Sequence, residues 1–187
     1  HAQAVAPAAR ALGIHARVYM PRSTPRVKQT AVRQHGDKWV EIRLAGERID
    51  NLPAEAMRRI HGRQIGAIFQ DPLTSLNPLY TVGRQLAETI RTHLPVDAAE
   101  ARRRAIGLLE STGIPAAAAR IDHYPHQFSG GMRQRVVIAL ALAAEPRLII
   151  ADEPTTALDV SIQAQIIVLL RRLCADQGTS VMLITHD

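Results

Sequence analysis

The sequence predicts an α/β fold built on a parallel sheet, with a helical insert between the first strand of that sheet and the next. Three short apolar runs, at residues 65–69, 148–151 and 180–184, have the length and composition of buried strands. A helical stripe separates the last two runs, which makes them a βαβ unit with a parallel pair. An amphipathic helical stretch over 82–113 supplies the insert. With 187 residues, 47% of them apolar, the chain can form one substantial core.

The first 38 residues differ in composition from the rest of the chain. They are rich in Ala, Arg, Pro, Gln and His, and Pro7, Pro21 and Pro25 interrupt any helical pattern, so we expect this segment to be disordered. Seven basic residues and one acid lie here, which accounts for the whole formal charge of +6. The remaining 16 basic and 16 acidic residues balance, and the charge therefore gives no argument for binding nucleic acid.

The elements follow in a regular order from Trp39 onward. Residues 39–44 alternate apolar and polar as a half-buried strand does, 45–47 supply a turn, and 52–60 form a short helix opened by Pro53. Residues 128–132 form a loop that leads into a helix over 133–144, which stops before Pro146. The helical stripe of the βαβ unit is formed by Ile162, Ile166, Leu169 and Leu173.

The cysteine content and the hydropathy pattern limit the class of protein. A single cysteine, Cys174, allows no internal disulfide, suits a reduced intracellular setting, and has the position of a packed core thiol. No run of about 18 uncharged apolar residues and no signal-peptide pattern is present. We therefore expect any membrane role to come through a partner.

Polar residues follow each predicted strand at its carboxyl end. Gln70 follows the first strand, Asp152 and Glu153 follow the second, and His186 follows the third. Because parallel strands end at one edge of a sheet, these side chains should converge there. Adjacent carboxylates suit a divalent ion and an attacking water, although a pair of solvated acids capping a helix explains Asp152 and Glu153 equally well.

Three small residues lie just before the helix predicted over 133–144. Ser129, Gly130 and Gly131 would leave free backbone N–H groups at the positive end of the helix dipole, with no Cβ to obstruct a phosphate group. This arrangement predicts an anion cradle. Taken alone, an ordinary loop with a helix cap is the more common explanation of such a motif.

Four motifs together resemble the ATP-binding subunits of ABC transporters of the peptide, nickel and glutathione importer family. Residues 124–136 resemble the signature motif, 148–159 resemble the Walker B strand followed by the D-loop, 185–187 resemble the switch-histidine loop, and 68–78 resemble the Q-loop. The resemblance covers about residues 40–187. It implies a P-loop NTPase core of the RecA-like type with an ABC α-helical subdomain, here incomplete.

The resemblance also implies a role for each matching residue, with ATP and Mg²⁺ as cofactors. Asp152 would bind Mg²⁺ through water, and Gln70 would sense the ion and move with the insert. Glu153 would be the general base, and His186 would contact the γ-phosphate. The signature residues that would bind the γ-phosphate held by an opposing subunit are Ser129, Gly130 and Gly131. Asp159 would couple the two sites across the dimer.

The domain boundaries follow from the same match. Residues 1–38 do not match the family, 39–70 run from a strand to the Q-loop, 71–135 form the helical subdomain with the signature motif, and 136–187 belong to the core. The chain departs from the family in one motif, because neither Lys28 nor Lys38 stands in a Gly-Lys-Ser/Thr phosphate-binding loop. We therefore expect a fragment that lacks the P-loop and the C-terminal part, and that has negligible ATPase activity alone.

The resemblance implies the partners and location of an importer motor. These are membrane permease subunits, a second ABC ATPase subunit, and indirectly a periplasmic or extracellular solute-binding protein, at the cytoplasmic face of a bacterial plasma membrane. No nucleic-acid partner is expected. Two alternatives remain: a non-enzymatic fragment that supplies the signature motif in trans, and an ATPase of the DNA-repair type. The latter usually carries coiled coils or zinc modules between Gln70 and Ser129, where this chain has one modest helical insert and no cysteine.

Overall fold

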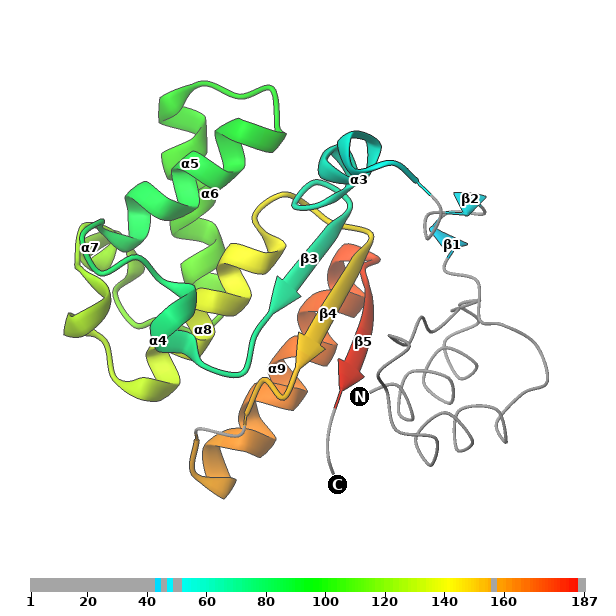
Figure 1. Ribbon diagram of the computed structural model, residues 1–187. Coiled ribbons are helices and arrows are strands. Elements are labelled where there is room, and N and C mark those ends of the chain that lie inside the picture. Colours follow the sequence, from blue (N-terminus) through cyan, green and yellow to red (C-terminus); the bar gives the residue numbers. More distant parts are fainter. Residues whose placement is uncertain (1–42, 45–46, 49–51, 156–157, 185–187) are drawn as a thin grey trace.

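A three-stranded parallel sheet forms the centre of the molecule (Figure 1). The computed structural model describes residues 43–44, 47–48, 52–155 and 158–184. The strands β3 (Ile65–Ile68), β4 (Leu148–Asp152) and β5 (Ser180–Ile184) lie in the order β3-β4-β5. Both pairs are parallel, with Ile68 opposite Ala151 and Asp152 opposite Ile184. The predicted α/β class is therefore confirmed, and all three apolar runs join one sheet.

Two long helices connect the strands and cover one face of the sheet. The chain passes through α8 (Gly130–Leu142) before β4 and through α9 (Val160–Gln177) before β5. Both crossovers step in the same direction, and right-handed connections then place both helices on the same face. Alternate strand residues point to that face and join the main core with the helices: Ile68, Ile149, Ala151 and Val181.

The helical insert consists of several helices, where the sequence predicted one amphipathic stretch. After β3 come α4 (Pro72–Ser75), α5 (Val82–His93), α6 (Ala98–Ser111), α7 (Ala117–Arg120) and the 3₁₀ helix η1 (Pro125–Gln127). The predicted stretch is broken because Pro95 cannot continue α5. Both new helix starts are capped: Thr81 accepts from the Arg84 N–H at 3.2 Å, and Asp97 from the Glu100 N–H at 2.8 Å.

The insert and the sheet share one continuous apolar core. Leu86 and Ile90 of α5 and Leu109 of α6 are fully buried in the same cluster as the strand residues. The middle of α8 is buried along several faces because it lies between the insert on one side and the sheet on the other, as Figure 1 shows. The position of the insert is therefore linked to the sheet mainly through α8.

Polar contacts reinforce this link at the loop between α8 and β4. Arg63, just before β3, donates to the carbonyl oxygens of Ala144 at 2.6 Å and Glu145 at 3.3 Å. Arg104 of α6 pairs with the Glu145 carboxylate at 2.9 Å and with Glu100 at 2.8 Å. Hydrogen bonds from Arg104 and then Arg103 lower the pKa of Glu100. These pairs are largely exposed, so they orient the loop more than they stabilise it.

The remaining described elements lie before β3. A two-residue strand β1 (Arg43–Leu44) pairs antiparallel with β2 (Glu47–Arg48), and α3 (Ala54–Ile60) begins after Pro53. The predicted strand over 39–44 falls within the described residues only at β1. Cys174 is buried on α9, as predicted, and burial raises the pKa of its thiol.

Candidate functional site

The carboxyl ends of β3, β4 and β5 form the edge where the sequence placed its polar residues. Ile68 ends β3 two residues before Gln70, and it lies opposite Ala151, one residue before Asp152. Asp152 in turn lies opposite Ile184 at the end of β5. Gln70, Asp152 and Glu153 therefore reach the same edge. His186, the fourth predicted residue of this group, lies outside the described residues.

Glu153 has an unusual backbone conformation for its position. Its φ is +46°, in the left-handed region that non-glycine residues seldom adopt, and Pro154 follows it and further restricts the backbone. Such conformations cost on the order of 1–3 kcal/mol and persist where the surroundings enforce them. Here the Glu153 N–H donates to the Ile184 carbonyl oxygen at 3.0 Å, which fixes the turn to the neighbouring strand.

This turn directs the Glu153 carboxylate toward Gln70. The Gln70 Nε2 amide donates to Glu153 Oε2 at 2.9 Å, across the ends of the two adjacent strands. Glu153 is only 8% exposed, whereas Gln70 is exposed. The structure therefore brings two of the predicted site residues into direct contact, an exposed amide and a buried carboxylate.

Asp152 completes the polar group as the last residue of β4, where it is half-buried. The atoms at this edge that could bind a metal ion are carboxylate and amide oxygens, the hard ligands that Mg²⁺ prefers. Magnesium is usually held by one or two carboxylates together with substrate phosphates. The residues present fit such an ion, with Asp152 as the carboxylate on the strand and the amide oxygen of Gln70 within the same group.

The Ser129–Gly131 motif lies at the N-terminus of α8. Ser129 is the N-cap, and its Oγ accepts from the Met132 N–H at 3.4 Å. The helix thus begins at Gly130, three residues before the predicted start, because the serine caps it there. Ser129 and Gly130 are exposed. Their backbone N–H groups are at the positive end of the helix dipole, the geometry that the cradle hypothesis requires.

The two glycines also have a packing role against the start of α9. A Cβ on Gly131 would lie 3.3 Å from the Ile162 Cγ2 atom, and one on Gly130 would lie 3.9 Å from the Leu158 Cδ2 atom. A side chain at Gly131 would therefore crowd Ile162, whereas one at Gly130 would make an ordinary van der Waals contact. Gly130 has room for a side chain, so its lack of a Cβ is not explained by its contacts within this chain.

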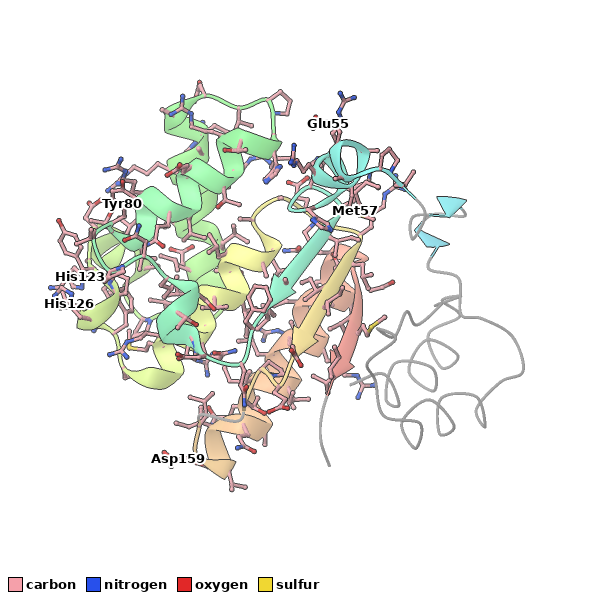
Figure 2. The ribbon with its side chains drawn as sticks, in the orientation of Figure 1. Glu55, Met57, Tyr80, His123, His126 and Asp159 are labelled. Carbon is pink, nitrogen blue, oxygen red and sulfur yellow. The ribbon has the colours of Figure 1, made fainter. Side chains whose placement is uncertain are left out.

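Asp159 marks the N-terminus of α9. Its carbonyl oxygen accepts from the N–H groups of Ile162 and Gln163, both at 2.9 Å, while its exposed side chain makes no capping bond. Figure 2 shows it at the tip of α9, away from Tyr80, His123 and His126 on the insert. Because Leu158 and Ile162 lie next to these glycines, Asp159 and the Ser129–Gly131 motif lie at the adjoining N-termini of α9 and α8.

One residue that organises the segment after Gln70 was not singled out from the sequence. The Gln85 side chain accepts from the Asn77 N–H at 2.9 Å and donates to the carbonyl oxygens of Asn77 and Tyr80, both at 3.0 Å. It therefore fixes the turn between α4 and α5. Its only sequence signal is a polar residue beside the apolar stripe of a helix, which is too common to identify it.

The parallel sheet, the carboxylates at its edge and the glycine-led helix α8 are together typical of an ATP-binding cassette. Residues 33–156 match the ABC transporter family. Since the match extends over more than half of the sequence, the chain belongs to this family of ATPases.

The chain is also similar to individual members of the family. It is 52% identical over 147 residues to the oligopeptide transport ATP-binding protein OppD of Bacillus subtilis, covering 79% of this chain and 41% of that protein. It is 51% identical over 147 residues to the dipeptide transport ATP-binding protein DppD of Escherichia coli, covering 79% and 45%. The chain thus spans less than half the length of the curated relatives it matches.

A solved structure supports the same fold. The ATP-binding cassette MJ0796, solved as a dimer in a post-hydrolysis state with ADP and Pi, matches with a TM-score of 0.66 and 32% sequence identity. The match covers 79% of this chain and 62% of that one. Among the described helices of this chain, none has both the length and the apolar character needed to cross a bilayer.

Proposed function

We propose that this chain is the ATP-binding and ATP-hydrolysing motor subunit of an importer for peptides or related small solutes. The observation that carries the proposal is the convergence of Gln70, Asp152 and Glu153 at the carboxyl edge of the parallel sheet. The similarity to oligopeptide and dipeptide transport proteins supports the substrate class.

Each residue at this edge has a distinct role in the proposed hydrolysis. Asp152 would hold Mg²⁺ through water, and the ion would supply positive charge that neutralises the phosphate groups. Glu153 orients and deprotonates the attacking water as general base. Gln70 contributes its amide oxygen beside the ion, and His186 contacts the γ-phosphate. Burial of Glu153 suits its role, because a nearly desolvated carboxylate interacts more strongly with the water that it activates.

The second surface acts on a nucleotide held by an opposing subunit. Ser129, Gly130 and Gly131 present helix N-terminal N–H groups to the γ-phosphate of that nucleotide, and Asp159 couples the two sites. The exposure of Ser129, Gly130 and Asp159 supports this assignment, since groups that serve a partner must be open in the single chain. The room for a side chain at Gly130 supports it as well, because packing within the chain does not require glycine there.

The remaining partners follow from the importer class. The chain associates peripherally with permease subunits at the cytoplasmic face of a bacterial membrane, pairs with a second ABC ATPase subunit, and acts indirectly with a solute-binding protein. The similarity to two bacterial transport subunits supports this arrangement, and the dimeric cassette structure supports the pairing.

The chain by itself does not hydrolyse ATP under this proposal. Its only lysines are Lys28 and Lys38, and neither stands in a Gly-Lys-Ser/Thr sequence. A phosphate-binding loop needs such a lysine and the backbone amides around it. Removing one oriented donor from a comparable site costs about 2.7–4 kcal/mol of transition-state stabilisation, so the loss of several donors is expected to reduce the rate to background.

The decisive measurement is Mg-ATP binding by the purified chain, compared with a version in which residues 1–38 are replaced by an intact P-loop region. If only the replaced version binds Mg-ATP, the result would support an intact set of hydrolytic residues in a chain that lacks its own phosphate-binding loop. Binding by the native chain would contradict the proposed defect. Failure of both versions would contradict the proposed ATP site itself.

A second candidate function is that the chain supplies the Ser129–Gly131 motif in trans to a partner that carries a P-loop. The exposure of Ser129 and Gly130 at the N-terminus of α8 favours it as an activity that needs no P-loop. The DNA-repair alternative has less support, because the similar proteins named above are transport subunits.

A further inference from the structure

The strand β5 lies at one end of the described sheet. The strand order is β3-β4-β5, so β5 is paired with β4 on one side. Figure 1 shows α9 behind the sheet and not beyond the outer edge of β5. Among the residues that the structure describes, no strand pairs with this outer edge. Such an edge presents backbone donors and acceptors to a further strand.

The pairing with β4 determines which backbone groups of β5 point outward. The Ser180 N–H donates at 2.9 Å to the carbonyl oxygen of the residue before β4, and the Ile184 carbonyl oxygen accepts at 3.0 Å from the Glu153 N–H. Successive residues of a strand direct their N–H and C=O groups to alternate sides. The first, third and fifth residues of β5 therefore bond to β4, and the N–H and C=O groups of Val181 and Leu183 point away from it.

The side chains of β5 do not protect this edge against pairing. Residues 179–184 contain no charged residue, no proline and no glycine, and half of them are β-branched. Edge strands of natural proteins usually carry a charge, a proline or a bulge that prevents a further strand from adding. Val181 is half-buried, and Leu183, two residues along on the same face, is 37% exposed. The edge is therefore apolar as well as open to backbone pairing.

A second copy of β5 fits this edge in antiparallel register. Residues directly opposite each other in an antiparallel pair can exchange both of their N–H···O bonds. A two-fold axis at Met182 sets Val181 of each copy opposite Leu183 of the other, so all the outward groups of these two residues find partners. The same pairs bring their apolar side chains together on one face, and no like charges are opposed within the strands. The contact closes on itself as a symmetric dimer.

We propose that this chain forms a homodimer in which two β5 strands pair antiparallel and join the two sheets into one. The occupant of the edge is a second copy because the strand complements itself in backbone spacing, side-chain character and charge. The proposal goes beyond the proposed function and needs no nucleotide. It is also distinct from the proposed pairing with an opposing ATPase subunit, which uses the Ser129–Gly131 motif.

The mass of the complete chain in solution without nucleotide is the first test. Sedimentation velocity over a range of concentrations should show a species of twice the chain mass of 20.5 kDa. Leu183→Lys adds a charge to the edge, and Leu183→Pro removes an outward N–H that the pairing with β4 does not use. Each should raise the dimer dissociation constant about tenfold or more.

Two control variants separate this dimer from other associations. Val168→Lys introduces the same charge at an apolar position on α9 that is 68% exposed, and it should leave the dissociation constant unchanged. Gly130→Asp alters the motif proposed to face an opposing cassette and should also leave it unchanged. Far-UV circular dichroism confirms that each variant is folded, and Leu183→Lys alone suffices if the proline variant does not fold.

Amide exchange followed by NMR tests the register of the pair. The Val181 and Leu183 amides should exchange more slowly as the protein concentration rises, because only the dimer bonds them. The Met182 amide bonds to β4 and should be protected at every concentration.

A chain that stays monomeric would overturn the proposal, as would a dimer that Leu183→Lys does not weaken. Protection of Val181 and Leu183 that does not depend on concentration would overturn it too, since another segment of the same chain would then hold the edge. None of these measurements involves ATP. A failure of the proposed function would appear instead as a lack of Mg-ATP binding in the version with an intact P-loop region.

Discussion

Three non-glycine residues of the described chain have a positive φ, and they illustrate different relations between strain and function. Glu153 at +46° belongs to the candidate site, where its conformation directs the carboxylate toward Gln70. Glu145 at +52° lies in the loop bound by Arg63 and Arg104. Ala116 at +50° is exposed, and its methyl side chain can make no hydrogen bond. Removing the backbone strain at Ala116 should therefore cost no hydrogen bond.

We expect Ala116→Gly to raise the free energy of unfolding by about 0.5–1 kcal/mol, because glycine adopts the left-handed conformation without steric cost. Ala118→Gly, at an exposed position within the regular turn of α7, is the matched control. It should lower stability by up to about 1 kcal/mol through lost helix propensity. Urea denaturation of both variants measures the difference, and equal effects would contradict the strain assigned to Ala116.

The sequence correctly predicted that the site residues lie at the carboxyl edge of the sheet, but it did not predict the contacts between them. Gln70, Asp152 and Glu153 each follow an apolar run, and the parallel arrangement alone brings such residues to one edge. The hydrogen bond between Gln70 and Glu153 depends on the turn at Glu153, which the Ile184 carbonyl oxygen fixes from a strand far along the chain. Local sequence carries no signal for a conformation imposed by tertiary contacts. The roles of these side chains stay predictions.

At the scale of elements, the close approach of β3 to α8 determines how the insert is joined to the sheet. A Cβ built on Gly66 would lie 2.6 Å from the Ala141 carbonyl oxygen, a backbone atom that cannot move independently of α8. Glycine at this position therefore sets the distance between strand and helix.

Gly66→Ala is expected to lower the free energy of unfolding by about 1–3 kcal/mol, because the added methyl forces α8 away from the sheet. Gly107→Ala in α6 provides the opposite case, since a Cβ there meets no atom within 4 Å. It should raise stability by about 1 kcal/mol through helix propensity. Thermal and urea unfolding of both variants test the pair. A neutral Gly66→Ala would mean that strand and helix can separate at little cost.

Hydrophobic periodicity was sufficient to predict the bounds of the strands, whereas local capping and proline residues determined the bounds of the helices. The buried runs of β3, β4 and β5 were predicted within one residue, because strand-length apolar runs have few alternatives. The helix begins at Gly130, three residues before the predicted start, because the Ser129 side chain caps it there. The insert was predicted as one stretch, although Pro95 divides it into α5 and α6.

At the scale of the whole molecule, the predicted site residues fall into two groups on different elements, and only one group contains Glu153, the proposed general base. The Ser129–Gly131 motif and Asp159 lie at the joined N-termini of α8 and α9. Their contacts with each other involve Leu158 and Ile162, so this surface is built without the carboxylates at the sheet edge. The proposed role of this surface in a dimer therefore does not require the carboxylates at the sheet edge.

Addition of this chain should stimulate ATP hydrolysis by a cassette partner that carries a P-loop, and Gly130→Asp should abolish the stimulation. An aspartate there places a negative charge beside the phosphate and blocks the helix N-terminus. Gly107→Asp is the control, because it adds the same charge at an exposed position on α6. Steady-state phosphate release measures both. Stimulation that survives Gly130→Asp would exclude supply of this motif in trans.

The buried position of Cys174 has a practical consequence for the study of this molecule. It is the only cysteine of the chain, it is 3% exposed on α9, and burial raises the pKa of its thiol. A thiol reagent can therefore react only when α9 separates from the core, and no other sulfhydryl competes. The reaction rate of the Cys174 thiol with an absorbing disulfide reagent therefore reports how often the core opens around α9. The measurement needs no engineered label.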